Sequence, residues 1–196
     1  MRRVILASAS LRRSAILSSC GIAHSVVPSG IEEILDKEKP VSEIVKTNAV
    51  MKASFVASGR SGEVVIGADT LVVCSDNVIG KPKDAAEAKN ILRSFSGRKI
   101  SVYTGLCVID TSTGVRSSGA DESCITVPKL EEDDVESYFP FLGPYDKAGG
   151  FSIEGAGAIF FDDIKGSYFN ILGLSLMTLK RLFTEAGLDI LDFMGG

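Results

Sequence analysis

Two arginines follow a serine-rich turn near the start of the chain. The segment LASASLRRSA covers residues 6–15, and Ser10 can cap a helix whose first turn then contains Arg12 and Arg13. A helix N-terminus carries unsatisfied N–H donors and a partial positive charge, so cations there are unfavourable unless an anion is also present. Ser8, Ser10 and the arginines are therefore a candidate cradle for a phosphate group. The alternative is that both arginines lie on the solvated face of the helix.

A carboxylate interrupts an apolar run later in the chain. Asp69 lies within residues 63–73, a segment rich in Val and Ile, and directly follows the small residues Gly67 and Ala68. A buried unpaired carboxylate is costly, so it normally has a metal, a cation or a hydrogen-bond network beside it. Glu32 and Glu33 could join Asp69 around a hard divalent cation such as Mg²⁺. The alternatives are an aspartate that caps a neighbouring loop and two ordinary surface acids.

Lysines and a glycine-rich loop extend this inventory. Lys52 lies on a predicted helix and Lys81 in a Gly-Lys-Pro turn, and each alone is typical of a solvated surface. With the arginines and acids, they meet the needs of transfer at a phosphoryl group, which requires cations for spread negative charge and carboxylates for a metal. The loop at residues 145–155 carries Lys147 and Glu154. It is either a ligand-binding loop, with Glu154 accepting hydrogen bonds from a nucleobase, or a surface turn.

Composition and charge exclude several classes of protein. A net charge of −4 and a pI near 5.1 argue against nonspecific nucleic-acid binding. No stretch approaches the roughly 20 apolar residues of a membrane span, and the apolar run after the N-terminal arginines is too short for an export signal. The four cysteines lack metal-like spacing and are typical of reduced core residues. We expect a cytoplasmic protein without nucleic-acid or membrane partners.

The hydrophobic pattern predicts the elements that must position these residues. Strands are expected at residues 3–7, 24–27, 63–73, 100–109, 124–127, 158–161 and 168–170, and helices from the Ser10 cap to Gly21 and at residues 41–56, 85–95, 133–138 and 175–186. Turns are expected at residues 111–114 and 163–166. Helices and strands alternate without repeats or a clear linker. This order predicts an α/β fold with a mixed central sheet flanked by helices, in one domain over residues 1–196, and it is compatible with two lobes and a cleft.

Taken in order, these motifs resemble those of the Maf family of nucleoside triphosphate pyrophosphatases. The matching motifs are SxSxRR at residues 8–13, GADT at 67–70, GKP at 80–82 and the DKAG loop at 146–155. The resemblance extends from residue 5 to about residue 183. It implies an α/β fold with a cleft, a divalent metal (Mg²⁺ or Mn²⁺) and cleavage of a nucleoside triphosphate between its α and β phosphates. It also implies that Asp69 is the proton acceptor and that the enzyme has a house-cleaning role.

The resemblance also suggests which base is preferred. Family members that act on dTTP and UTP have Arg, Thr and Gln at three positions, whereas the 7-methyl-GTP branch has a Trp-Arg-Arg turn, Gln after the aspartate and Glu in the late loop. This chain has Arg12 and Thr70, as in the first branch, and Glu154, as in the second. An ionised Glu offers only acceptors, whereas Gln offers a donor and an acceptor. We expect dTTP and UTP as substrates, with 7-methyl-GTP, or a non-catalytic nucleotide-binding regulator of cell division, as alternatives.

The residue chemistry and the resemblance together give each candidate residue an expected role. Catalysis is expected of Asp69, Lys52 and Lys81, substrate binding of Ser8, Ser10, Arg12, Arg13, Thr70, Lys147 and Glu154, and metal binding of Glu33, Asp69 and Glu32. Leu11, Met51 and Ser175 depart from the usual Pro, Glu and Pro of the family, and none of them removes a proposed catalytic group. The sequence does not select an oligomeric state, and a homodimer is one alternative.

Overall fold

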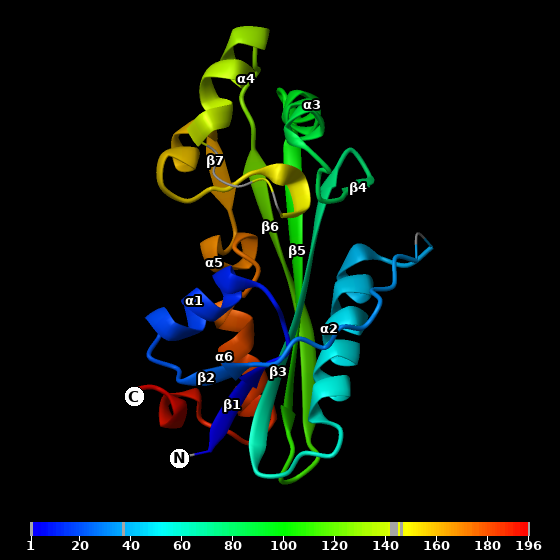
Figure 1. Cartoon of the computed structure of the whole chain (residues 1–196), viewed down its shortest axis with the longest axis vertical. Helices are drawn as coiled ribbons and strands as arrows, with labels where there is room; N and C mark the ends of the chain where they lie inside the picture. Colours follow the sequence, from blue (N-terminus) through cyan, green and yellow to red (C-terminus); the bar gives the residue numbers. More distant parts are fainter. Residues whose placement is uncertain (1, 37, 142–144, 146, 196) are drawn as a thin grey trace. The chain divides into compact units, whose positions relative to one another are not determined.

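The computed structural model describes residues 2–36, 38–141, 145 and 147–195 as a mixed α/β fold (Figure 1). In chain order the elements are β1 (Arg3–Leu6), α1 (Leu11–Ser19), β2 (His24–Val26), α2 (Val41–Ala57), β3 (Glu63–Cys74), β4 (Asn77–Ile79), α3 (Ala85–Phe95), β5 (Lys99–Asp110), β6 (Arg116–Thr126), α4 (Glu132–Tyr138), η1 (Phe139–Phe141), η2 (Ala148–Gly150), η3 (Gly155–Phe160), β7 (Asp163–Lys165), α5 (Tyr168–Ile171), α6 (Leu176–Glu185) and η4 (Ile190–Phe193), where η denotes a 3₁₀ helix. Asp146 of the DKAG motif lies outside the described residues.

The strands form one mixed sheet, as the sequence predicts. Among the described residues it has seven strands in the order β2-β1-β3-β5-β6-β7, with β4 paired to β3. Strand β1 runs parallel to both neighbours, and Leu6 pairs with Val26 on one side and with Ile66 on the other. Strand β4 is antiparallel to β3, and β7 is antiparallel to β6. No described helix combines the length and apolar character needed to span a membrane.

The chain divides into two compact units. The first contains Met1–Asp69, Thr104–Asp121 and Gly173–Gly196, and the second contains Thr70–Tyr103 and Glu122–Leu172. Strands β3, β5 and β6 each contribute residues to both units. The boundary in β3 falls directly after Asp69.

Three predictions for the second unit are wrong. Residues 158–161 lie mostly in the 3₁₀ helix η3 and form no strand. Residues 168–170 belong to helix α5, because the side chain of Ser167 accepts a hydrogen bond from the Asn170 N–H at 3.3 Å and so caps a helical turn. The segment expected as a turn at residues 163–166 contains β7, which ends at Lys165 and is followed by Gly166 with a φ of 102°.

One hydrophobic core cluster of the first unit lies between α2 and the sheet. Its buried apolar side chains come from β1 and the residue that follows it, α2, β3 and β5, namely Ile5, Ala7, Ala49, Ala53, Val56, Val65, Cys107 and Ile109. Figure 1 shows α2 on one side of these strands and α1 and α6 on the other. Phe55, an apolar residue of α2, is 61% exposed and lies outside this cluster.

Two glycines allow the backbone of α2 to touch the sheet. A Cβ atom at Gly67 would lie 2.2 Å from the carbonyl oxygen of Ala49, and one at Gly105 would lie 2.2 Å from that of Val45. Both distances are far below van der Waals contact, so only glycine permits this approach. The glycine of the GADT motif is therefore required for the packing of α2 on β3.

Substitution of Gly67 by alanine is expected to destabilise the protein by about 2–4 kcal/mol, because the added methyl group must push α2 away from β3. Urea unfolding followed by far-UV circular dichroism measures the loss. The matched control is Gly80→Ala, since a Cβ atom at Gly80 would meet no atom within 4 Å. Equal stability of the two variants would contradict the close approach.

An ion pair ties the start of β1 to the end of β5. Arg2 donates from Nη1 to Oδ2 of Asp110 at 3.0 Å and from Nη2 to the other carboxylate oxygen. The Asp110 side chain is only 3% exposed. Hydrogen bonding from Arg2 is the main reason that the pKa of Asp110 falls from its ordinary value to about 2.

Replacement of Arg2 by methionine is expected to cost about 1–2 kcal/mol of stability at neutral pH, after allowance for the partial exposure of Arg2. Because the pKa of Asp110 is lower in the folded state than in the unfolded state, its ionised carboxylate stabilises the fold at pH values above the unfolded-state pKa. This stabilisation is lost as the pH falls toward about 2. The difference from the wild type should therefore be constant above about pH 5 and should narrow below pH 4. Denaturation across this range measures it, with the exposed neighbour Arg3→Met as control. A difference independent of pH would refute the linkage.

Candidate active site

The first turn of the chain is shaped by its two serines. The Ser10 side chain caps α1 by accepting from the Arg13 N–H at 3.4 Å. The hydroxyl oxygen of Ser8 accepts from the Ser10 N–H at 3.3 Å and from Nη1 of Arg13 at 2.8 Å. The predicted helix cap is confirmed, and the serines also hold an arginine in place.

Arg13 links this turn to the segment that precedes Asp69. Its Nη1 donates to the carbonyl of Ala68 at 3.0 Å, and its Nε donates to the carbonyl of Gly173 at 2.8 Å. Burial lowers the pKa of the Arg13 guanidinium, while attraction by the carboxylates of Asp69 and Glu33 opposes this effect. An arginine remains charged under such conditions. The structure thus places a permanent positive charge near both predicted carboxylates.

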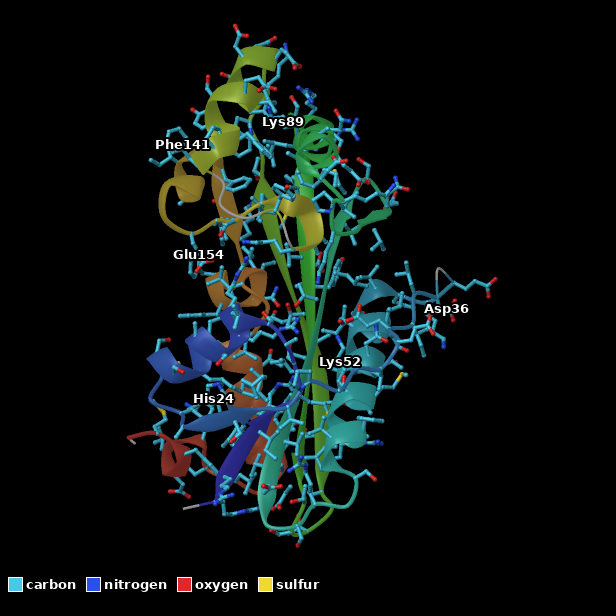
Figure 2. The ribbon with its side chains drawn as sticks, in the orientation of Figure 1. His24, Asp36, Lys52, Lys89, Phe141 and Glu154 are labelled. Carbon is cyan, nitrogen blue, oxygen red and sulfur yellow. The ribbon has the colours of Figure 1, made fainter. Side chains whose placement is uncertain are left out.

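The ammonium group of Lys52 joins the two carboxylates. Its Nζ donates to Oε1 of Glu33 at 2.6 Å, to Oδ1 of Asp69 at 2.7 Å and to the carbonyl of Ala68 at 3.4 Å. The side chains of Lys52 and Asp69 are 10% and 4% exposed, whereas that of Glu33 is 55% exposed. Figure 2 marks Lys52 between α2 and the strands. Three predicted site residues, distant in sequence, therefore form one charge-paired cluster.

The geometry of strand and helix explains this cluster. Side chains two residues apart on a strand share a face, so Asp69 points to the same side of β3 as Gly67, toward α2. Residues four apart on a helix share a face, so Asn48 and Lys52 lie together on the buried stripe of α2. The close approach at Gly67 brings these two faces into contact.

Sequence reasoning missed Asn48. Its side chain is 1% exposed, and its Nδ2 donates to Oδ2 of Asp69 at 2.9 Å and to the carbonyl of Ile34 at 3.0 Å. Its Oδ1 accepts from the Ile34 N–H at 2.9 Å. A polar residue on the core-facing stripe of α2, one turn before Lys52, was the available signal.

Glu33 and Asp69 fit a divalent cation that also binds a substrate. Carboxylate oxygens are the ligands that Mg²⁺ prefers, and it is commonly held by one or two carboxylates together with substrate phosphates. No group of three or more His, Cys, Asp or Glu side chains suited to a metal occurs within the described part of the chain. Glu32 is exposed next to Glu33 and does not complete a preformed three-carboxylate site with the pair. Arg12 is half-buried on α1.

The remaining predicted residues belong to the second unit. Thr70 follows Asp69 on β3 and is half-buried, and Lys81 is exposed in the Gly-Lys-Pro turn. The N–H of Gly149 donates to the carbonyl of Gly80 at 3.1 Å, so the glycine-rich loop packs on that turn. Lys147 immediately precedes η2 in this loop. Two lysine-bearing segments are thereby adjacent within this unit.

Glu154 lies further along the same loop and is exposed. Its Oε2 accepts from the Ser152 hydroxyl at 3.1 Å, and its N–H donates to the Ser152 oxygen at 3.2 Å. These two bonds hold the residue in a local turn, with the position of the carboxylate defined by Ser152. Figure 2 labels Glu154 on this segment.

Comparison with known proteins gives consistent matches. The dTTP/UTP pyrophosphatase of Moorella thermoacetica is 38% identical over 97% of this chain and 98% of that protein. The protein of the same name from Desulforamulus reducens is 38% identical over 97% of this chain and 100% of its own length, and that from Bacillus cereus strain ZK / E33L is 36% identical over 97% and 98%. A solved nucleoside-triphosphatase / dITP/XTP pyrophosphatase from Mycobacterium abscessus aligns with 65% of this chain and 74% of its own at 15% identity, with a TM-score of 0.41, too low to establish a common fold.

The family comparison covers both units. The family model described as Maf-like protein matches residues 3–186. This range includes the β1–α1 turn, the Lys52 cluster and the glycine-rich loop. The chain therefore belongs to the Maf family.

Proposed function

We propose that this chain is a nucleoside triphosphate pyrophosphatase that hydrolyses dTTP and UTP to the monophosphate and pyrophosphate. The observation that carries the proposal is the cluster in which Lys52 bridges the buried Asp69 of the GADT motif and the largely exposed Glu33. The names of the three relatives support the substrate class. Removal of unwanted nucleotides, a house-cleaning role, is the expected purpose.

In the proposed reaction, water adds across the anhydride between the α and β phosphates. The water oxygen bonds to phosphorus, the bridging oxygen leaves with the other phosphate group, and the Asp69 carboxylate takes the proton. Lys52 holds Asp69 through the bond to Oδ1. A divalent cation, Mg²⁺ or Mn²⁺, held by Glu33 and Asp69 with Glu32 beside them, would neutralise charge on the triphosphate.

Charge balance supports roles for the other predicted cations. The formal charges of Arg13, Lys52, Glu33 and Asp69 cancel, so this cluster alone has no surplus to offer a polyanion. Phosphoryl transfer needs cations that stabilise the spread negative charge. We assign this task to Lys81 as a catalytic residue and to Arg12 and Lys147, with Ser8 and Ser10 in the phosphate-binding turn.

Residues 1–196 are proposed to act as one functional domain, because the family match includes segments of both units. Action in the cytoplasm is supported by the free cysteines Cys20, Cys74, Cys107 and Cys124, which suit a reducing compartment. The partner is a small-molecule nucleoside triphosphate, and the net charge of −4 disfavours nucleic acid. For the oligomeric state, a homodimer is one proposal.

A second candidate substrate is 7-methyl-GTP, and the observation that favours it is Glu154. A carboxylate in this loop accepts hydrogen bonds but cannot donate one to a pyrimidine carbonyl. Arg12 and Thr70 agree with the pyrimidine branch. We therefore retain dTTP and UTP as the preferred substrates.

Asp69→Asn is expected to reduce the kcat for pyrophosphate release by about 10²–10⁴-fold, because the amide cannot act as the proton acceptor. Nucleotide binding should be partly retained, since the phosphate-binding cations remain. Pyrophosphate release is measured on a panel of canonical and modified triphosphates with Mg²⁺, Mn²⁺ or a chelator, and affinity is measured by calorimetry.

The control for this test is Asp133→Asn, the same change at an exposed position of α4. Undiminished turnover in Asp69→Asn would exclude Asp69 as the proton acceptor. Nucleotide binding without hydrolysis by the wild type under every metal condition would favour the regulator instead.

Glu154→Gln is expected to raise kcat/KM for dTTP and UTP relative to 7-methyl-GTP by about tenfold, because glutamine supplies the missing donor. Competition assays with paired substrates measure this ratio. The exposed Glu38→Gln serves as the control. An unchanged ratio would remove Glu154 from base recognition.

A further inference from the structure

The side-chain amide of Asn48 uses all of its main hydrogen-bonding groups in the first unit. An asparagine has two N–H donors and one carbonyl acceptor. The donors bind Oδ2 of Asp69 and the carbonyl of Ile34, and the acceptor binds the Ile34 N–H, at 2.9–3.0 Å. With only 1% exposure, this amide has little competition from water.

The two bonds to Ile34 fix the backbone directly after Glu33. The amide engages both the N–H and the C=O of one residue, as a neighbouring strand would. Ile34 and Leu35 are 44% and 51% exposed, so only about half of each is buried against the protein. The buried contact with Asn48 is thus an anchor for the loop that carries Glu33.

The bond to Asp69 fixes the orientation of its carboxylate. Lys52 binds Oδ1 and Asn48 binds Oδ2, so the two oxygens are held by different residues of α2. An ammonium is a point charge with rotatable donors, whereas an amide donates in a defined plane. Asn48 therefore adds directional control that the ion pair lacks.

We propose that Asn48 is a positioning residue for the reaction, setting the plane of the Asp69 carboxylate and its spacing from Glu33 through one side-chain amide. This inference rests on the proposed function for the catalytic consequence. The anchoring of Ile34 stands independently of it. In this proposal Asn48 acts through Asp69, to which it donates, and through the loop that carries Glu33.

The first test is Asn48→Leu, which keeps a side chain of similar size and removes all three hydrogen bonds. Misplacement of reacting groups on the ångström scale lowers turnover strongly, so kcat should fall about 10–100-fold. KM should change less than about threefold, because the phosphate-binding cations are untouched. Asn90→Leu makes the same chemical change at an exposed position of α3 and is the control.

Hydrogen exchange gives a readout that does not depend on activity. The Ile34 amide should exchange at least about tenfold faster in Asn48→Leu than in the wild type, since it loses its buried acceptor. Amides of α6 should keep their wild-type rates, which separates a local loss of anchoring from general destabilisation.

A second variant separates the two contacts and serves if Asn48→Leu fails to fold. Asn48→Asp keeps an acceptor for the Ile34 N–H and loses both donors. We expect the Ile34 amide to remain more protected than in Asn48→Leu, while kcat falls by a similar factor. If only Asn48→Asp folds, its lowered kcat at nearly unchanged KM is the decisive result.

The outcomes distinguish the inference from the function on which it rests. Wild-type kcat in either folded variant would overturn the positioning role. Unchanged exchange of Ile34 in Asn48→Leu would overturn the anchor. Absence of triphosphate hydrolysis by the wild type, together with the expected change in exchange, would refute the proposed function and the catalytic role of Asn48 while supporting the anchor.

Discussion

The backbone contact between α2 and the sheet determines the geometry of the whole cluster. It depends on Gly67 and Gly105, which have no side chain. A residue with a Cβ atom at either position would clash with the backbone of α2. Asp69 lies on the same face of β3 as Gly67, and Lys52 lies on the buried stripe of α2. The Lys52 ammonium and the Asp69 carboxylate can therefore meet at 2.7 Å. The same packing that forms the hydrophobic core also brings the charges together.

Burial makes these charges interdependent. Removal of one partner from a buried ion pair leaves the other uncompensated, at a cost of about 3–5 kcal/mol. Lys52 bridges one buried and one largely exposed carboxylate, so the cluster extends from the core toward solvent. Asp69 is the inner member and Glu33 the outer one. This gradient suits a group that must be held in place yet remain accessible to a substrate.

The sequence was informative where a single residue was physically unusual in its surroundings. Asp69 within an apolar strand and the serine cap before two arginines both predicted real features. The aromatic segment at residues 168–170 was misleading, because a strand-like composition was overridden by the Ser167 cap. Asn48 was overlooked because an asparagine in a helix is usually a surface residue, and its buried position emerges only once α2 is packed on the sheet.

The mixed sheet was predictable from the alternation of elements, whereas its strand order was not. Parallel pairing of β1 with β2 and β3 depends on contacts between segments far apart in the chain. The division into two compact units, with its boundary after Asp69, likewise has no local signature. Single-residue chemistry was thus easier to infer than the long-range pairing that organises it.

The hydrogen bond from Arg13 to Gly173 has a consequence for how the molecule is made. These residues are 160 positions apart, so the bond cannot form until Gly173 has been synthesised and has left the ribosome. Helix α1 can fold early, yet the Gly173 carbonyl that accepts from Arg13 is synthesised 160 residues later. Closure of so large a loop favours slow, late consolidation of this region. In the nascent chain, Arg13 is therefore present long before its hydrogen-bond acceptor at Gly173.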